Sequence, residues 1–304
     1  MSSKRLIIGS RGSDLALMQA GVVQAALRDA CGRESEIKVI RTQGDRVEHL
    51  SLDKMEGTGF FTKELEDALL DESIDLAVHS LKDLPTAQPP GLKIGAVGFR
   101  ADRRELLLIR PGVRFGAGVL PVRPEAVIGT SSTRRRAQIV YHNPTLQVKD
   151  LRGNVPTRIR KLRDGQYDAI VIAAAGVERL GLDLSDLDTI YLKVEDFIPA
   201  PGQGVLAIEL RNDDEELASA VAQLNSPTVE TEISAERGLL KKFNAGCSLP
   251  LGVFAQVGDS HIRLTAVLGI GDGDNCGGLK RVDVTAGSVD EVVNSAFAAL
   301  TRGD

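Results

Sequence analysis

Residues 5–13, Arg-Leu-Ile-Ile-Gly-Ser-Arg-Gly-Ser, form a short apolar run that stops at a glycine and passes into polar turn residues. This order predicts a buried strand, a tight turn and a helix whose N-cap is Ser13. The helix is expected to reach about residue 28, with an apolar face spaced in steps of three or four: Leu15, Met18, Val22 and Ala26. Four segments complete this predicted unit: a strand at 36–41, a Gly-rich loop at 44–59, a helix near 61–71 and a strand at 74–79.

The same succession of elements recurs further along the chain. Ala126-Val-Ile-Gly129 predicts a strand, and Ser131 or Ser132 can cap a helix to about residue 142. A strand at 146–149, a helix at 155–163 and a strand at 168–173 then follow in the same order. Such alternation predicts two α/β domains with mostly parallel sheets. Ligands of such sheets lie beyond the carboxyl ends of the strands, where helix N-termini offer N–H groups to anions.

The remaining segments connect and extend these two halves. Turn-rich stretches near 97–104 and 196–204 predict two crossings, and a strand at 205–210 is expected to return to the first domain. Beyond residue 225 the pattern predicts a helix near 228–243, strands near 251–257, 261–270 and 279–285, and a helix near 289–300. The expected architecture is two α/β domains around a cleft plus a small α+β C-terminal domain. The predicted boundaries are 1–99 with 203–222, 100–200, and 225–304.

Composition and charge exclude several classes of protein. Of 304 residues 42% are hydrophobic, and 37 Lys and Arg against 42 Asp and Glu give a net charge of −5. A net-acidic chain with 4% aromatic residues is a poor nucleic-acid binder. No apolar run approaches the roughly 18 residues of a membrane span. The first apolar run has three residues before Gly9, which is too short for the apolar core of a signal peptide. A cytoplasmic location is therefore expected.

Cysteine and histidine are few and widely spaced. The three cysteines are Cys31, Cys247 and Cys276, and an odd number fits no disulfide framework. The four histidines are His49, His79, His142 and His261. None of these residues has the spacing of a metal-ligand motif, so no metal site is expected.

Arginine is concentrated at the turns where this architecture places ligands. Arg11 lies in the first strand-to-helix turn, and Arg134–Arg136 open the helix of the matching turn. Arg152 and Arg158 flank a helix start, and Arg179 follows the strand 168–173. Cations at a helix N-terminus oppose the helix dipole, which indicates a functional reason for them. Guanidinium groups suit carboxylates or phosphates, so the pattern favours a polyanionic ligand. The alternative is a set of solvated or capping arginines.

Two further residues and one loop are chemical candidates. Asp83 follows the strand 74–79, where its carboxylate could balance an arginine or stabilise positive charge in a substrate. Cys247 lies in the turn-rich loop Asn-Ala-Gly-Cys-Ser-Leu-Pro. A lone cysteine is more often a small buried apolar residue, but the position beside Gly246 makes an accessible thiol more plausible than usual. The loop Glu56-Gly-Thr-Gly59 is either a lid or an ordinary connection.

Six motifs, in order along the chain, resemble those of the hydroxymethylbilane synthase (porphobilinogen deaminase) family. They are Gly9-Ser-Arg-Gly-Ser-Asp-Leu-Ala-Leu-Met-Gln19, Asp75-Leu-Ala-Val-His-Ser-Leu-Lys-Asp-Leu-Pro85, Gly129-Thr-Ser-Ser-Thr-Arg-Arg135, Leu151-Arg-Gly-Asn-Val-Pro-Thr-Arg158, Pro201-Gly-Gln-Gly204 and Gly246-Cys-Ser-Leu-Pro-Leu-Gly252. The resemblance implies three domains, of which the first two are like type II periplasmic binding proteins.

The resemblance also implies a chemistry. A transferase of this family condenses four porphobilinogen molecules onto a dipyrromethane cofactor, one per chain, with loss of ammonia, and then releases hydroxymethylbilane by hydrolysis. It implies that Cys247 carries the cofactor as a thioether and that Asp83 stabilises the cationic intermediate beside the pyrrole N–H groups. The implied cofactor-binding set also contains Lys82, Ser132, Arg134 and Arg135. The implied substrate-binding set is Arg11, Ser13, Arg152, Arg158 and Arg179. A monomer without nucleic-acid or membrane partners is expected.

The chain departs from the family pattern at two places. Thr58 stands where many relatives have lysine, although Lys54 and Lys63 are near, and Asn244-Ala245 replaces the more usual acidic residue and glycine. The main alternative function is a non-catalytic bilobal anion-binding module, which explains the halves and the arginines but gives Cys247 and Asp83 no role. A nucleic-acid binder is a third possibility, suggested by Arg134–Arg136 alone.

Overall fold

The computed structural model describes residues 5–42, 62–244, 249–271 and 278–302. The chain divides into two compact units. Unit 1 contains the described residues up to Ala101 together with Gly204–Glu230, and unit 2 contains Asp102–Gln203 together with the described residues from Thr231 onward. No helix within these described ranges is long and apolar enough to cross a membrane.

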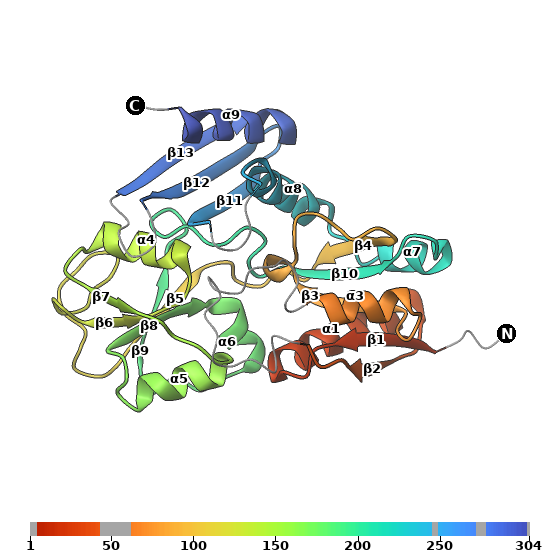
Figure 1. The fold of residues 1–304 in the computed structure, drawn as a ribbon, viewed down its shortest axis with the longest axis horizontal. Coiled ribbons are helices and arrows are strands. Elements are labelled where there is room, and N and C mark those ends of the chain that lie inside the picture. The colour runs from red at the N-terminus through yellow and green to blue at the C-terminus, as the bar shows by residue number, and fades with distance from the viewer. Residues whose placement is uncertain (1–4, 43–61, 245–248, 272–277, 303–304) are drawn as a thin grey trace. The chain divides into compact units, whose positions relative to one another are not determined.

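Unit 1 is built on a five-stranded sheet in the order β2-β1-β3-β10-β4. Its strands are β1 (Leu6–Ser10), β2 (Ser35–Val39), β3 (Leu76–Ser80), β4 (Leu92–Gly98) and β10 (Leu206–Arg211). Its helical segments are α1 (Asp14–Cys31), α3 (Lys63–Leu70), the 3-10 turn η2 (Leu81–Asp83) and α7 (Glu215–Ala222). Figure 1 labels these strands and α-helices. Val23 of α1 and Val221 of α7 pack against one face of the sheet, and Leu65 of α3 packs against the other.

The first sheet of unit 2 has a matching order, β7-β6-β8-β5-β9. Its strands are β5 (Glu105–Ile109), β6 (Val127–Gly129), β7 (Gln147–Lys149), β8 (Ala169–Ala173) and β9 (Asp188–Leu192). Its helices are α4 (Thr133–His142), α5 (Val155–Arg163) and α6 (Ala174–Leu180). Ile139 of α4 packs against one face of this sheet, whereas Ile159 of α5 and Val177 of α6 pack against the other.

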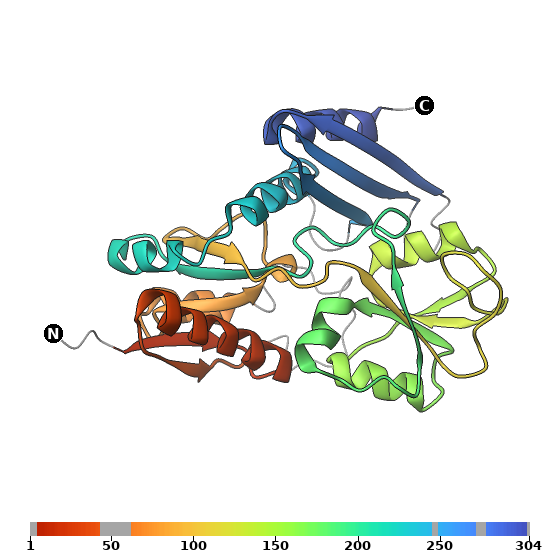
Figure 2. The ribbon, with the colours of Figure 1, turned by 180° about the vertical axis from the view of Figure 1, so that it is seen from behind.

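Unit 2 also contains an antiparallel sheet in the order β11-β12-β13. These strands are β11 (Leu251–Val257), β12 (Ile262–Ile270) and β13 (Gly278–Ala286), accompanied by α8 (Pro227–Lys242) and α9 (Val289–Thr301). The two helices pack against the sheet (Figure 2). Leu239 of α8 and Val292 of α9 belong to one apolar cluster with Val253 of β11 and Leu264 of β12. Every observed bound here lies within one residue of its prediction. Two α/β sheets plus a small α+β part confirm the predicted fold class, whereas the three domain boundaries remain predictions.

The duplication seen in the sequence is visible in one repeated hydrogen bond. In unit 1, the Ile7 N–H donates to the Asp75 carboxylate at 2.8 Å. In unit 2, the Val127 N–H donates to the Asp168 carboxylate at 2.9 Å. Each aspartate directly precedes the strand that pairs in parallel with the strand of its donor. The same side chain therefore fixes the same strand pair in both halves.

A glycine near the carboxyl end of β1 and another at the end of β6 each lie close to an apolar side chain. A Cβ on Gly9 would lie 2.3 Å from Ile74 Cδ1, and a Cβ on Gly129 would lie 2.8 Å from Tyr167 Cδ1. Both distances are shorter than a non-bonded carbon contact of about 3.5–4.0 Å. Glycine thus allows the turn to pass close to the neighbouring strand before the helix begins.

The prediction of mostly parallel sheets is confirmed, with one antiparallel strand in each of the two α/β sheets. The strand β1 pairs in parallel with β2 and β3, but β10 is antiparallel to β3 and β4. Likewise β6 is parallel to β7 and β8, but β5 is antiparallel to β8 and β9. The two antiparallel strands enter at the carboxyl end of a neighbour, where Leu206 lies opposite Ser80 and Glu105 lies opposite Ala173. A chain that arrives at that end must run back along the sheet.

The predicted apolar face of the first helix (Leu15, Met18, Val22 and Ala26) is wrong, because other residues of the helix are the buried ones. Val22 is 36% exposed, while the residues of α1 that are fully buried against the sheet are Ala20, Val23 and Leu27. The helix carries two apolar stripes, so its period alone does not select the buried one. Six elements of the described part of the chain were not predicted at all: β4, β5, β9, α6, α7 and the 3-10 turn η2.

Replacing Asp168 by asparagine is expected to destabilise the fold at neutral pH. Arg110 and Arg123 donate to the carboxylate at 3.1 and 2.9 Å, in addition to the Val127 N–H. Partial burial raises the pKa of Asp168, but these three donors outweigh burial and lower the pKa below its ordinary 3.8. A carboxyl group with a lowered folded pKa stabilises the fold above its unfolded pKa, and this stabilisation is lost as the pH falls through the folded value. Denaturant unfolding should show a wild-type advantage of about 1.5–3 kcal/mol at pH 7. The advantage should shrink at acidic pH below 3.8; an unchanged difference would contradict this.

Candidate active site

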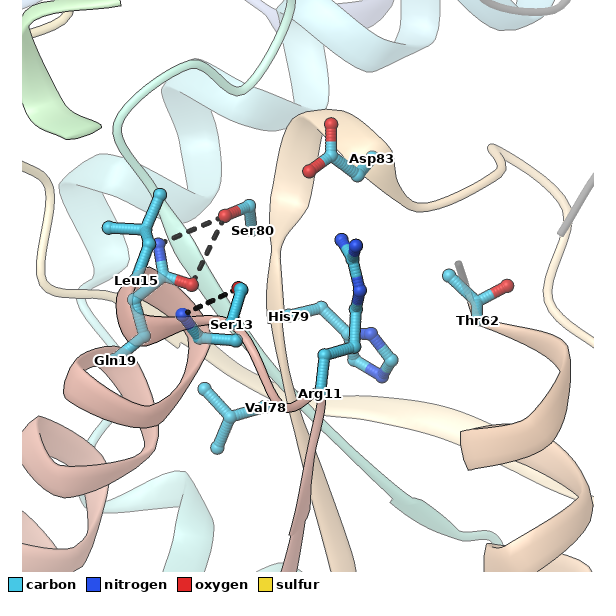
Figure 3. A pocket seen from close by; sticks show the side chains of 10 residues that line it. Arg11, Ser13, Leu15, Gln19, Thr62, Val78, His79, Ser80 and Asp83 are labelled. Atoms are coloured by element: carbon cyan, nitrogen blue, oxygen red, sulfur yellow. Dashed lines mark hydrogen bonds between the residues drawn. The ribbon is translucent and has the colours of Figure 1, made fainter. Parts of the chain in front are cut away.

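A pocket in unit 1 lies beyond the carboxyl ends of β1 and β3, beside the N-terminus of α1. It is lined by Arg11, Ser13, Leu15, Ala16, Gln19, Thr62, Val78, His79, Ser80 and Asp83. In Figure 3 the Arg11 side chain projects from the turn after β1, with its guanidinium on the side of the pocket where Asp83 lies. The structure therefore brings together three residues that the sequence selected, namely Arg11, Ser13 and Asp83.

The wall opposite Arg11 is fixed by short polar contacts. The Ser13 hydroxyl accepts the Ala16 N–H at 3.3 Å, which confirms Ser13 as the N-cap of α1. The Gln19 amide donates to the Ser80 hydroxyl at 3.0 Å, and that hydroxyl donates back to Gln19 Oε1 at 3.2 Å (Figure 3). Side chains locked in this way hold the shape of a ligand site.

Asp83 and Lys82 belong to the short turn η2, which follows β3 directly. The turn is anchored by a hydrogen bond from the Leu81 N–H to the carbonyl of Val205, the residue before β10, at 3.0 Å. Asp83 is exposed and lines the pocket, whereas Lys82 is half-buried and does not line it. The carboxylate of Asp83 is thus held on a rigid strand end and remains accessible to a ligand.

In unit 2, the helices α4, α5 and α6 follow the carboxyl ends of the adjacent strands β6, β7 and β8. The Ser132 hydroxyl accepts the Arg135 N–H at 3.4 Å, so Ser132 is the N-cap of α4. Asn154 caps α5 by accepting the Thr157 N–H at 2.9 Å, as its position before Pro156 predicts. Two of the predicted anion-binding turns are therefore closed by side-chain caps.

The neighbouring Ser131 ties these two turns together. Its hydroxyl donates to the Leu151 carbonyl at 3.0 Å and accepts the Leu151 N–H at the same distance. The next residue along the chain is Arg152. These two hydrogen bonds hold the turn before α4 and the turn that leads into α5 together, at the carboxyl ends of β6 and β7.

Arg134 and Arg135 share one buried carboxylate. Arg134 Nη2 lies 2.6 Å from Glu105 Oε1, and Arg135 Nη2 lies 2.8 Å from Glu105 Oε2. Glu105 is fully buried, and the two arginine side chains are 6% and 7% exposed. Arg134 also donates to the Ile198 carbonyl at 2.8 Å, and Arg135 donates to the Val171 carbonyl at 3.0 Å. Burial lowers the pKa of Arg134 and Glu105 raises it, with a net lowering.

Two cations against one anion leave this buried cluster with an excess positive charge. The Arg135 Nε–H is buried and has no hydrogen-bond partner among the described residues. A buried donor without a partner is costly, and a carboxylate ligand would satisfy both the donor and the charge. Arg136, by contrast, forms an ion pair with Asp150 at 3.0 Å. The chemistry of Arg134 and Arg135 therefore fits an anionic group, whereas Arg136 is accounted for locally.

The other arginines selected from the sequence lie at neighbouring positions of unit 2. Arg152 and Arg158 are half-buried on either side of the α5 start, where Arg158 Nε donates to the Gly153 carbonyl at 2.7 Å. Arg179 is half-buried in the last turn of α6. Burial lowers its pKa, against a smaller opposite effect from Glu178.

Some candidates lie outside the described residues, and others escaped the sequence reasoning. Cys247 and Cys276, together with Lys54, Thr58 and the loop Glu56–Gly59, lie outside the described residues. The residues missed are His79, Gln19 and Ser80 of the pocket wall, and Glu105 and Glu209 behind the two sites. The first three lie inside the quoted motifs. The two glutamates had a signal of their own, since each is the single charged residue in an apolar segment, 105–109 or 205–210.

Strand-end turns with Arg11 and Asp83 in one unit, and a cluster of arginines in the other, define an α/β protein that binds an anionic ligand. Residues 6–219 match the family described as "porphobilinogen deaminase, dipyromethane cofactor binding domain", and residues 230–289 match its C-terminal domain. The chain belongs to the porphobilinogen deaminase family. This confirms the family, the function and the dipyrromethane cofactor that the motifs implied, and it favours the enzyme over the anion-binding module.

Individual relatives agree with the family match over most of the chain. The porphobilinogen deaminase of Syntrophobacter fumaroxidans is 42% identical over 275 residues, which is 90% of this chain and 87% of the relative. That of Geobacillus kaustophilus is 41% identical over 298 residues, 98% of this chain and 94% of the relative. A periplasmic substrate-binding protein of an ABC transporter from Coxiella burnetii is 14% identical, with a TM-score of 0.45 over 76% of this chain and 96% of that one.

Proposed function

We propose that this chain is a transferase that condenses four porphobilinogen molecules head to tail and releases hydroxymethylbilane by hydrolysis. The growing product would be attached to a dipyrromethane cofactor, held as a thioether on Cys247. One observation carries the proposal: Arg11 and Asp83, which the family resemblance assigns to the substrate, line the same pocket of unit 1. We also propose that the enzyme is cytoplasmic and monomeric and has no nucleic-acid or membrane partner.

The arginines would bind the carboxylates of the pyrroles. Porphobilinogen carries an acetate and a propionate, so each added ring brings two anions into the site. Arg11, Arg152, Arg158 and Arg179, with Ser13, would hold substrate, because guanidinium and hydroxyl donors suit carboxylate oxygens. The cofactor-binding set would be Lys82, Ser132, Arg134 and Arg135. Two features support the assignment of this buried arginine pair to a cofactor carboxylate. The pair has an excess positive charge, and the Arg135 Nε–H has no hydrogen-bond partner among the described residues.

Asp83 would act on the reacting pyrrole. Loss of ammonia from porphobilinogen breaks a carbon–nitrogen bond and leaves a positive charge that the pyrrole nitrogen shares. A fixed carboxylate beside the N–H group stabilises that charge more than the neutral ring, which lowers the barrier. The cofactor, when bound, supplies the pyrrole carbon to which the first substrate is joined. The exposed carboxylate on an anchored strand end supports this role for Asp83.

The proposal is tested by turnover of the purified chain. Incubation with porphobilinogen should release ammonia and give the linear tetrapyrrole, followed by its mass and by chemical oxidation to a coloured porphyrin. A chain that binds porphobilinogen but releases no ammonia would overturn the proposal in favour of a binding module.

Replacing Arg135 by lysine is expected to impair cofactor loading with little change in thermal stability. Lysine keeps a positive charge beside the buried Glu105. Its single ammonium group cannot also place a donor where the Arg135 Nε–H points. Loss of a charge-assisted hydrogen bond costs about 1.5–3 kcal/mol. This corresponds to cofactor binding that is weaker by about tenfold to a hundredfold.

The matched control is Arg136→Lys, because Arg136 is the next residue and pairs with Asp150 outside the cluster. The fraction of chains that carry the adduct, measured by intact mass, should fall for the Arg135 variant alone. Equal loading in the two variants would return Arg135 to a structural role.

A further inference from the structure

A buried histidine–glutamate pair lies behind the pocket of unit 1. His79 Nε2 lies 3.0 Å from Glu209 Oε2, and the two side chains are 4% and 0% exposed. They come from the neighbouring antiparallel strands β3 and β10, where Glu209 is opposite Ala77 and His79 is opposite Ala207. Alternation along a strand places both side chains on the sheet face of Ala77, which α3 covers. The pair is thus withdrawn from solvent inside the sheet.

The duplicated half shows that the fold does not need this pair. Ser80 lies opposite Leu206 in unit 1, as Ala173 lies opposite Glu105 in unit 2. Counting from these matched positions, Ile172 corresponds to His79 and Leu108 corresponds to Glu209. Ile172 and Leu108 are buried together in one apolar cluster.

A buried ion pair is a weak means of stabilising a fold, and apolar residues of similar volume often replace it without loss. Moreover, Glu209 Oε1 is buried without a hydrogen-bond partner among the described residues. A pair selected for stability alone would satisfy that oxygen. The polar pair of unit 1 therefore requires a different reason.

The pocket supplies that reason. His79 lines it together with Arg11 and Asp83, and Figure 3 shows the imidazole beneath the Arg11 side chain. Thr62, which precedes α3, lines the same pocket, and Glu66 lies one turn further along. Burial raises the pKa of Glu66, Thr62 opposes this, and Glu209 raises it further. This side of the pocket thus combines low solvent access with two carboxyl groups, those of Glu209 and Glu66, near the imidazole.

We propose that His79 is a further substrate-binding residue, which Glu209 orients so that its second ring nitrogen binds a carboxylate of the pyrrole. An imidazole has two ring nitrogens for polar contacts. Nε2 contacts Glu209 at 3.0 Å, so Nδ1 is left for the ligand. The inference rests on the proposed function, since the ligand is the carboxylate-bearing substrate of that reaction.

The test exchanges the pair for the apolar residues of the duplicated half. In the double variant His79→Ile with Glu209→Leu, the sheet should stay folded, with a thermal midpoint near that of the wild type. The single variant His79→Ile should be less stable, because it leaves Glu209 buried without its hydrogen-bond partner. We expect KM for porphobilinogen to rise by about tenfold or more in the double variant, the effect of losing one charged hydrogen bond.

These outcomes separate the binding role from a structural one. A structural pair predicts that the double variant regains both stability and activity, and a wild-type KM would overturn the proposal. His79→Gln serves if the double variant does not fold, because glutamine keeps a polar contact for Glu209 and removes the second ring nitrogen. An unchanged KM in that variant would equally overturn the proposal. Failure of the wild type itself to release ammonia would instead refute the proposed function.

Discussion

Replacing Cys247 by serine is expected to give a folded chain that carries no pyrrole adduct and makes no tetrapyrrole. A thiolate is a far better carbon nucleophile than a hydroxyl group at neutral pH. Without a thioether the chain has no anchor on which product can grow, so activity should be lost completely rather than reduced. Intact mass and ammonia release, measured on the same sample, check both parts of this expectation.

Cys31→Ser is the matched control. The Cys31 thiol donates to the Ala220 carbonyl at 3.2 Å and packs against the apolar core of unit 1. Burial raises the pKa of Cys31, against a smaller effect of Arg33, and so disfavours the reactive thiolate. This variant should therefore keep its adduct and its turnover. Full turnover by the Cys247 variant, with no pyrrole attached, would refute the anchoring role.

Replacing Asp83 by asparagine is expected to reduce turnover by about 10²–10³-fold, by analogy with removing one preorganised electrostatic contact. Asparagine preserves the shape and the hydrogen-bonding reach of the side chain but removes its charge. The change thus isolates the stabilisation of positive charge as ammonia leaves. Cofactor loading and substrate binding should survive much better than turnover.

The decisive comparison is single-turnover ammonia release from wild-type and Asp83→Asn proteins that both carry cofactor. Asp71→Asn is a suitable control, since Asp71 is an exposed residue at the end of α3 and does not line the pocket. Equal rates for the wild type and the Asp83 variant would mean that Asp83 only balances nearby cations.

Local sequence patterns were sufficient for those features that depend on local interactions. Ser13, Ser132 and Asn154 each cap the helix that their positions predict, because a cap bonds to a backbone N–H two or three residues away. The antiparallel sheet of unit 2 was predicted within one residue at each strand end, since each of its strands is a separate apolar run. The strand-end location of Arg11 and Asp83 followed from the same reasoning.

Features that depend on distant partners were not predictable in this way. The direction of β5 and β10 is set by where the chain enters each sheet, which no period in the sequence encodes. The burial of Arg134 and Arg135 depends on Glu105, about thirty residues earlier. The His79–Glu209 pair joins residues 130 positions apart. For both glutamates the available signal was a charged residue within an apolar strand. That signal does not identify the residue with which the glutamate pairs.

The central claim is that this chain carries a pyrrole cofactor on Cys247, and the intact mass of the purified wild-type protein tests it most directly. The account predicts a mass above that of the sequence by two pyrrole units, located by peptide mapping on the fragment that contains Cys247. A homogeneous, unmodified chain that still converts porphobilinogen to the linear tetrapyrrole would contradict it.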